Sequence, residues 1–250
     1  MLLFVVTFAC ARLSADGGKA LVGGTLINGL GSTPIQNNVI LVRNGRIEKV
    51  GTIDTLQVPE GYEVISTEAM SVLPGLWDMH VHLMINGHSD YDYWDVAYAD
   101  KLASEIMPAS AVQLLLAGVT TARDLGAPLE DSLKVRDRIN AGVVLLVGTD
   151  NGIPMKFHCQ STWNELDVWV RIMDIPAMET IQSATYWPSK FMGVENDWGT
   201  IVAGRYADII AVKGDVLKYI NLLQDVDFVM KGGVVYKHDG QAVEENLKTR

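Results

Sequence analysis

Short runs of apolar residues, bounded by turn residues, lie near both ends of the chain. They cover residues 20–27, 39–43 and 46–50 on the N-terminal side, and residues 207–212, 227–230 and 234–236 on the C-terminal side. Runs of this length and composition are typical of β-strands. Asn44-Gly45 and Gly232-Gly233 each separate two adjacent runs, and both pairs favour the tight turn of a β-hairpin. The pattern predicts two β-rich ends that together build one small sheet domain.

The region between these ends alternates strand-like and helix-like patterns. Strand-like segments lie at residues 73–82, 118–124 and 144–150, and helix-like segments lie at residues 97–116, 129–139, 166–173 and 176–184. This alternation is typical of a parallel sheet whose strands are connected by helices. We therefore expect an α/β domain at residues 74–195, flanked by the β-rich residues 19–73 and 196–250.

Composition and charge restrict the class of partner. The chain has 250 residues, of which 48% are hydrophobic, and this suits one or two globular domains with a real core. Its formal net charge is -10 and it has no basic cluster, so nucleic acid and anionic membrane surfaces are not expected partners. The two cysteines, Cys10 and Cys159, make no disulfide framework. We expect Cys159 to be a buried or half-buried thiol.

The first eleven residues, MLLFVVTFACA, are almost entirely apolar. The run is too short to span a membrane, but it is typical of the apolar part of a secretory signal peptide, with Ala9 and Ala11 placed for cleavage. No basic residue precedes it, so a first strand or a wrongly assigned start is the alternative. We interpret residues 1–18 as a leader, which predicts a secreted or cell-envelope protein, and otherwise a cytoplasmic one.

Three polar residues alternate along the segment Asp78-Met79-His80-Val81-His82. Residues two apart on a strand point to the same side, so Asp78, His80 and His82 share one face. Neutral imidazoles side by side are good ligands for Zn²⁺ or a similar divalent ion. A surface strand with two polar positions is the alternative, because a His-x-His sequence also occurs by chance.

Four segments are distinctive when taken together: LPGLWDMHVHL, GVTTARDLG, VGTDNGIP and GTIVAGRYADIIAVKGD…VDFVMKGGVVYK. In this order they resemble the metal-dependent amidohydrolase superfamily, and most of all its imidazolonepropionase-like and Xaa-Pro dipeptidase-like branch. The resemblance implies a TIM-type (β/α) barrel beside a β-sandwich that both chain ends build. It also implies hydrolysis of carbon–nitrogen bonds with one or two divalent ions.

The resemblance assigns roles to individual residues. His80 and His82 match the pair that binds one ion, and Asp150 matches an aspartate that both binds metal and acts as general base on the attacking water. His158 follows Phe157 where relatives often carry a Phe-His pair, so it is a candidate for shaping the site. Arg123 ends the second strand and either reaches the substrate or forms a structural salt bridge. Asp78 either orients one of the histidines or caps the strand.

The chain is too short for the whole barrel. A complete barrel takes roughly 200–250 residues and each strand–helix unit about 30, so residues 74–195 supply three or four units. The motifs match the first, second and eighth strands of the family. The part that would carry strands three to seven, with a bridging lysine and two histidines, is missing. We expect the three strands to pair as an open sheet with exposed edges, because the eighth strand of a closed barrel neighbours the first.

These observations lead to an α/β protein with a truncated TIM-type barrel and a composite β-sandwich. Its expected function is metal-dependent hydrolysis of an amide, dipeptide or cyclic amide, with a small molecule or dipeptide as substrate. The alternative is a catalytically impaired remnant, isoform or gene-model fragment with weak metal binding. No membrane span is expected, and the exposed sheet edges favour self-association.

Overall fold

The computed structural model of the protein describes residues 17–85, 87, 90–124, 147–152 and 156–248. The expected leader at residues 1–18 lies almost wholly outside the described residues, and so does the expected helix at residues 129–139. Among the described residues, no helix is both long and apolar enough to cross a membrane.

The N-terminal region forms a four-stranded sheet of β1 (Lys19–Val22), β3 (Asn38–Arg43), β4 (Arg46–Thr52) and β5 (Glu63–Ser66), in the order β4-β3-β1-β5. The β3–β4 turn is Asn44-Gly45, as the sequence predicts. Both residues have positive φ, 52° and 75°, which a two-residue type I′ hairpin turn requires.

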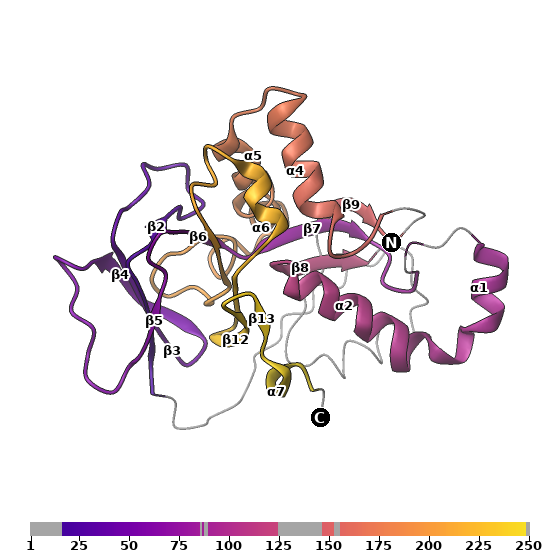
Figure 1. Cartoon of the computed structure of the whole chain (residues 1–250), viewed down its shortest axis with the longest axis horizontal. Coiled ribbons are helices and arrows are strands. Elements are labelled where there is room, and N and C mark those ends of the chain that lie inside the picture. The colour runs from indigo at the N-terminus through magenta and orange to yellow at the C-terminus, as the bar shows by residue number, and fades with distance from the viewer. Residues whose placement is uncertain (1–16, 86, 88–89, 125–146, 153–155, 249–250) are drawn as a thin grey trace.

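The second sheet joins the two ends of the chain. It has the order β13-β12-β11-β10-β6-β2, with bounds β2 (Thr25–Leu26), β6 (Met70–Pro74), β10 (Ile209–Lys213), β11 (Phe228–Lys231), β12 (Val234–His238) and β13 (Gln241–Ala242). β6 pairs antiparallel with β10, with Pro74 opposite Ile209. The prediction that strands from both ends meet is therefore confirmed (Figure 1).

One apolar core lies between these two sheets. It contains Leu21 and Ile40 from the first sheet and Val72, Ile209 and Phe228 from the second, all of them buried. The hairpin turns of the two sheets also meet, because the backbone N–H of Ala207 donates to the carbonyl of Gly45 and the N–H of Gly233 donates to that of Ala207.

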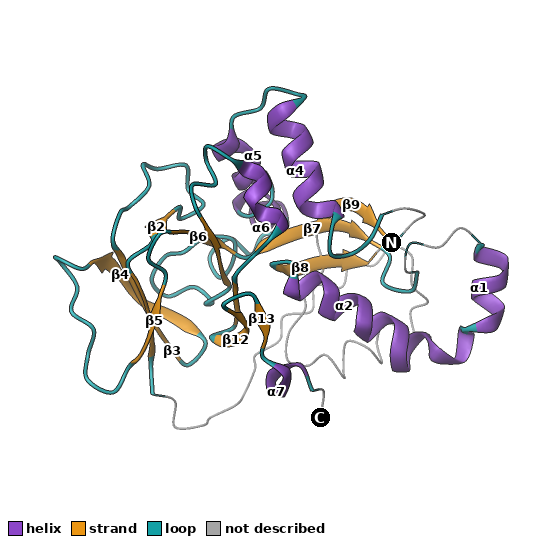
Figure 2. Ribbon diagram, viewed as in Figure 1, coloured by secondary structure: helices purple, strands orange, loops and turns teal. Residues whose placement is uncertain are grey.

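The third sheet is parallel and contains β7 (Leu76–Val81), β8 (Val119–Asp124) and β9 (Val147–Asn151), in the order β8-β7-β9. This is the order that the resemblance predicts. In Figure 2, α2 (Met107–Leu116) lies next to β8 and α4 (Ser161–Arg171) lies next to β9. Leu114 of α2, Leu76 of β7 and Leu166 of α4 belong to one buried cluster, so both helices pack against the sheet.

The remaining helical segments are short. They are α1 (Tyr91–Ala97), α5 (Ala177–Ser183), α6 (Tyr186–Phe191), α7 (Glu244–Leu247), two 3₁₀ turns at Ala99–Lys101 and Ile220–Gln224, and a π-helical turn at Leu102–Ile106. The single helix expected at residues 97–116 is therefore wrong in its first half, where several short turns precede α2. Cys159 is exposed and free, so the prediction of a buried or half-buried thiol is also wrong. It lies in a turn before α4 rather than in the core.

Candidate metal centre

The strands β7 and β9 bring two sequence motifs to one edge of the parallel sheet. In their register Met79 lies opposite Val147 and Val81 opposite Asn151. His80 is the penultimate residue of β7, His82 follows the strand, and Asp150 is the penultimate residue of β9. Both strands run in the same direction, so all three side chains leave the C-terminal edge of the sheet.

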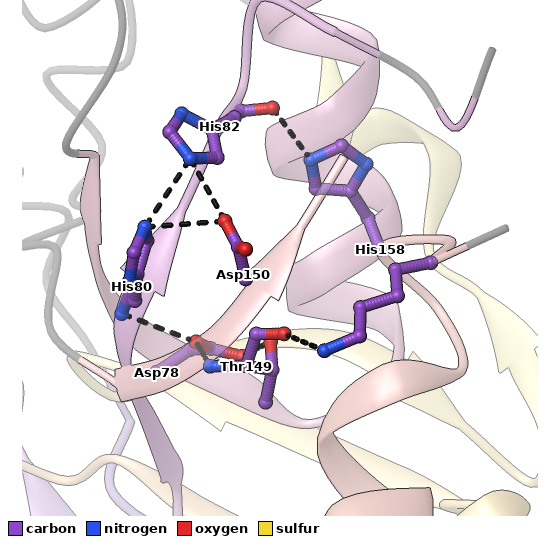
Figure 3. A network of polar contacts seen from close by, with 7 residues as sticks. Asp78, His80, His82, Thr149, Asp150 and His158 are labelled. Atoms are coloured by element: carbon purple, nitrogen blue, oxygen red, sulfur yellow. Dashed lines mark hydrogen bonds and ion pairs between the residues drawn. The ribbon is translucent and has the colours of Figure 1, made fainter. Parts of the chain in front are cut away.

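The side chains of His80, His82 and Asp150 converge on one point (Figure 3). The two Nε2 atoms are 3.2 Å apart. The Oδ1 atom of Asp150 is 3.1 Å from Nε2 of His80 and 2.9 Å from Nε2 of His82. The three side chains are 38%, 19% and 36% exposed, so each of them is partly accessible to solvent.

This donor set suits a divalent cation. Bonds of about 2.0–2.1 Å to a tetrahedral Zn²⁺ place its ligand atoms about 3.4 Å apart, and the three observed distances are only slightly shorter. Two imidazoles and one carboxylate also form a common ligand set of catalytic zinc sites, which leave a coordination position open.

Asp78 lies beneath the two histidines and ties the strands together. Its carboxylate accepts hydrogen bonds from the backbone N–H of Thr149 (2.9 Å), the hydroxyl of Thr149 (2.6 Å), the hydroxyl of Thr162 (2.7 Å) and the backbone N–H of His80 (3.3 Å). One buried carboxylate therefore connects β7, β9 and α4. Asp78 contacts His80 through the backbone N–H of that residue and also binds Thr149 of the neighbouring strand β9.

The pKa of Asp78 is raised to about 7 because burial disfavours the charged carboxylate. The hydrogen bonds from Thr149 and Thr162 act in the opposite direction and favour the charged form. The donors therefore offset part of the cost of placing this group in the protein interior.

The amidohydrolase family model matches this chain over residues 71–134 and 129–237. The two matches together cover more than half of the chain and include all three metal-ligand candidates. The chain belongs to the amidohydrolase family. Its members are enzymes, and the fold carries the family's motifs in the expected strand order.

Two curated proteins are similar to parts of this amidohydrolase chain. Protein LONG AFTER FAR-RED 3 of Arabidopsis thaliana is 38% identical over 69 residues, which is 27% of this chain and 12% of that protein. The dihydroorotase of Geobacter metallireducens is 45% identical over 49 residues, which is 20% of this chain and 11% of that enzyme. The chain thus aligns with only a small part of either relative.

Solved structures show the same fold at low sequence identity. A Xaa-Pro dipeptidase with bound methionine in its active site superimposes with a TM-score of 0.72 and 16% identity. The superposition runs over 88% of this chain and 100% of that one. The mixed α/β architecture is therefore that of amidohydrolases.

The structure places His158 beside the cluster rather than in it. Its side chain is fully buried, and Nε2 lies 3.2 Å from the carbonyl oxygen of His82. A carbonyl only accepts, so Nε2 carries the proton and the ring supports the backbone of His82. Burial lowers the pKa of His158 to about 4, and the ring is neutral near pH 7. Within the described residues Nδ1 of this ring has no hydrogen-bond partner.

Arg123 lies at the same edge of the sheet, on the neighbouring strand. It is the penultimate residue of β8 and half-buried, and the next residue, Asp124, lies opposite Val81 of β7. The structure therefore places Arg123 beside the end of β7 without making it part of the cluster.

Sequence reasoning missed three residues that support the centre: Thr149, Thr162 and Lys156. Thr149 directly precedes Asp150 in the VGTD motif, and this adjacency is the one signal that could have identified it. Thr162 lies on α4, and Lys156 donates from Nζ to the carbonyl of Thr149 at 2.9 Å. No local pattern marks either residue.

Proposed function

We propose that this chain binds a divalent ion, Zn²⁺ in the first place, through His80, His82 and Asp150. We further propose that the reaction is metal-assisted hydrolysis of a carbon–nitrogen bond in a small amide, dipeptide or cyclic amide. The observation that carries the proposal is the convergence of the three ligand atoms at the C-terminal edge of a parallel sheet. Barrel enzymes gather their active sites at this edge. The dihydroorotase relative and the likeness to a Xaa-Pro dipeptidase support this substrate class.

The residues of the chain divide the chemistry between them. A divalent ion would be held by His80, His82 and Asp150, and when bound it would supply a Lewis acid and a water molecule whose pKa is lowered towards about 7. The carboxylate of Asp150 would take up the proton that hydrolysis releases from water and return it to the leaving nitrogen. Asp78 fixes the backbone on both sides of the cluster.

We propose that the architecture is a truncated barrel at residues 74–195 beside a composite β-sandwich of residues 19–73 and 196–250. Only residues 125–146 separate β8 from β9. A strand–helix unit takes about 30 residues, so this interval has no room for the five units that would complete a closed barrel. The match to the family model in two pieces supports the same proposal.

The shortened barrel favours the second candidate, an impaired remnant, isoform or gene-model fragment that still binds metal weakly. Among the described residues, the cluster offers three ligands for a single ion. The lysine and the two histidines that the resemblance places on the missing strands would hold a second ion. Groups that act as one catalytic unit are strongly non-additive. We therefore expect hydrolysis far slower than that of a full-length relative.

Calorimetric titration with Zn²⁺, followed by turnover assays, tests the proposal. The wild-type protein should bind about one ion, and the double variant His80→Ala/His82→Ala should bind none. His238→Ala is the matched control, because this exposed histidine lies in β12 of the six-stranded sheet, outside the parallel sheet that carries the cluster. Xaa-Pro dipeptides and cyclic amides should be hydrolysed slowly, and Asp150→Asn should abolish this turnover. Unchanged zinc stoichiometry in the double variant would refute the metal site.

We also propose that residues 1–18 are a secretory leader and that the protein is secreted or lies in the cell envelope. The apolar first residues and the small residues at Ala9 and Ala11 support this. N-terminal sequencing of protein recovered from the culture medium or cell envelope tests it. An intact Met1 on cytoplasmic protein would contradict it.

A further inference from the structure

The four-residue segment that carries Asp150 is anchored at both of its ends. At Thr149 the backbone N–H donates to Asp78 at 2.9 Å, and the carbonyl accepts from Nζ of Lys156 at 2.9 Å. At Gly152 the backbone N–H donates to the carbonyl of Lys156 at 2.9 Å, and the carbonyl accepts from the N–H of Gly87 at 2.8 Å. Asp150 therefore lies between two residues, Thr149 and Gly152, and the backbone N–H and carbonyl of each are hydrogen-bonded.

Lys156 contributes to both anchors. Its side chain holds Thr149, one residue before Asp150, and its backbone carbonyl holds Gly152, two residues after Asp150. Lys156 therefore contacts the chain on both sides of Asp150. Asp78 accepts from the N–H and the hydroxyl of Thr149, so the residue before Asp150 is bound to a buried carboxylate on one side and to an ammonium group on the other.

The backbone of Asp150 shows why such anchoring matters. Its φ is +60°, which lies in the left-handed region that residues other than glycine seldom adopt. Conformations of this kind cost free energy and persist when the surrounding structure holds them in place. The bond to the Thr149 carbonyl restrains the peptide group directly before Asp150, and so restrains the direction in which the Asp150 side chain leaves the backbone.

We propose that Lys156 is a positioning residue for the metal ligand Asp150. Its ammonium group holds the Thr149 carbonyl and thereby keeps the Asp150 carboxylate aimed at the two histidines. The inference rests on the proposed metal binding and deepens it, because it adds a residue that acts on the ligand without touching the ion.

Electrostatics and positioning predict opposite effects of removing this lysine. A positive charge near a divalent cation repels it, so loss of the charge alone would strengthen metal binding. Loss of a group that orients a ligand weakens metal binding, and such changes typically cost about 10–100-fold in affinity. The direction of the change therefore separates the two roles.

The test compares Lys156→Met, which keeps the length and loses the donor, with Lys156→Arg, which keeps a donor and the charge. Lys49→Met is the matched control, because Lys49 is an exposed lysine on β4 of the N-terminal sheet. Zn²⁺ affinity is measured by calorimetry and Co²⁺ binding by its visible absorption, and thermal unfolding of each metal-free protein is followed by circular dichroism.

We expect Lys156→Met to bind both ions about tenfold or more weakly, with an altered Co²⁺ spectrum. Lys156→Arg should recover most of the affinity, and Lys49→Met should equal the wild type. The unfolding midpoint of metal-free Lys156→Met should stay close to that of the wild type, because the lysine is exposed.

Equal or tighter metal binding by Lys156→Met, with the wild type binding and His80→Ala/His82→Ala not binding, overturns the role of Lys156 alone. A large drop in the unfolding midpoint of metal-free Lys156→Met also overturns it, because the lysine would then support the whole fold. A wild-type protein that binds neither ion overturns both.

Discussion

At the scale of single residues, the buried carboxylate of Asp78 shows how polar groups are arranged under the cluster. It is fully buried, and its oxygens receive four hydrogen bonds from three elements. A buried charge without such partners would cost several kcal/mol. The stability of the centre should therefore depend on donors that lie far from Asp78 in the sequence.

Replacing Thr162 by valine tests this dependence. The change keeps the shape of the side chain but removes the hydroxyl that donates to Asp78. We expect the free energy of unfolding to fall by about 1–3 kcal/mol, the usual cost when a buried acceptor loses a hydrogen-bond donor. Urea denaturation monitored by tryptophan fluorescence measures it.

Thr180 provides the control for this change. It is also buried and helical, but within the described part of the chain its hydroxyl has no hydrogen-bond partner. Thr180→Val should leave the free energy of unfolding within about 1 kcal/mol of wild type, because no bond is lost. Equal losses for the two valine variants would show that the bond from Thr162 contributes nothing.

The residues of the centre differ in how far the sequence identifies them. His80, His82 and Asp150 belong to recognisable motifs, and the structure brings them together. Thr162 and Lys156 were not predictable, because their roles arise only when α4 and the segment after β9 pack against Thr149 and Asp78. Local patterns carry no information on such long-range contacts.

At the scale of elements, turn chemistry was the most reliable guide. The pairs Asn44-Gly45 and Gly232-Gly233 form hairpin turns, as predicted. All four residues have positive φ, which a tight hairpin turn requires and which Asn and Gly adopt most easily. The predicted helix at residues 97–116 was less accurate. Its apolar spacing does not show where the 3₁₀ and π-helical turns interrupt it, and α4 begins five residues earlier than its apolar pattern suggests.

Two glycines of these hairpins allow a matched prediction. Gly45 has φ +75°, and a Cβ atom there would lie 2.9 Å from the carbonyl oxygen of Gly232. Gly232 has φ +54°, and a Cβ atom there would meet nothing within 4 Å. Gly232→Ala should cost about 1–2 kcal/mol for the left-handed backbone alone.

Gly45→Ala should cost more, by a further 1–3 kcal/mol or so, because it also crowds the contact between the two sheets. Thermal unfolding of both variants measures the difference. Equal unfolding temperatures would indicate that the turns of the two sheets do not press against each other in solution.

Metal binding should strengthen the connection between β7 and β9. His80 and His82 come from one strand and Asp150 from the other, so an ion that binds only the folded state stabilises it by mass action. At a free Zn²⁺ concentration of about 100 times Kd, the gain is about 2.7 kcal/mol. Differential scanning calorimetry with zinc or with a chelator measures this shift. The shift should vanish in His80→Ala/His82→Ala, and a shift that persists there would place the ion elsewhere.

At the scale of the whole molecule, the parallel sheet and its helices leave apolar surface in contact with water. Among the described residues, β8 and β9 each pair with a strand on one side only. The side chains of Val96, Ile172 and Phe191 are 82%, 72% and 75% exposed. Open edges and apolar surface of this kind promote association with other chains.

We therefore expect the purified protein to self-associate. Light scattering coupled to size-exclusion chromatography should give a molar mass that exceeds the 27.4 kDa of one chain and rises with protein concentration. A monomer at every concentration, with cooperative unfolding and zinc-dependent turnover that Asp150→Asn abolishes, would contradict both this expectation and the expected weak activity. Three strands would then suffice to build a working site.

The pairing of β6 with β10 has a consequence for how the chain folds as it is synthesised. β6 lies between β2 and β10, and Val72 and Leu73 are completely buried there. The strand β10, which pairs with β6, begins at Ile209. It therefore emerges from the ribosome only after the whole α/β region has been made. Until then the N-terminal strands present apolar side chains that lack their final neighbours. We therefore expect the nascent chain to expose an apolar surface to chaperones during a long interval, and we expect the closure of this long loop to slow folding.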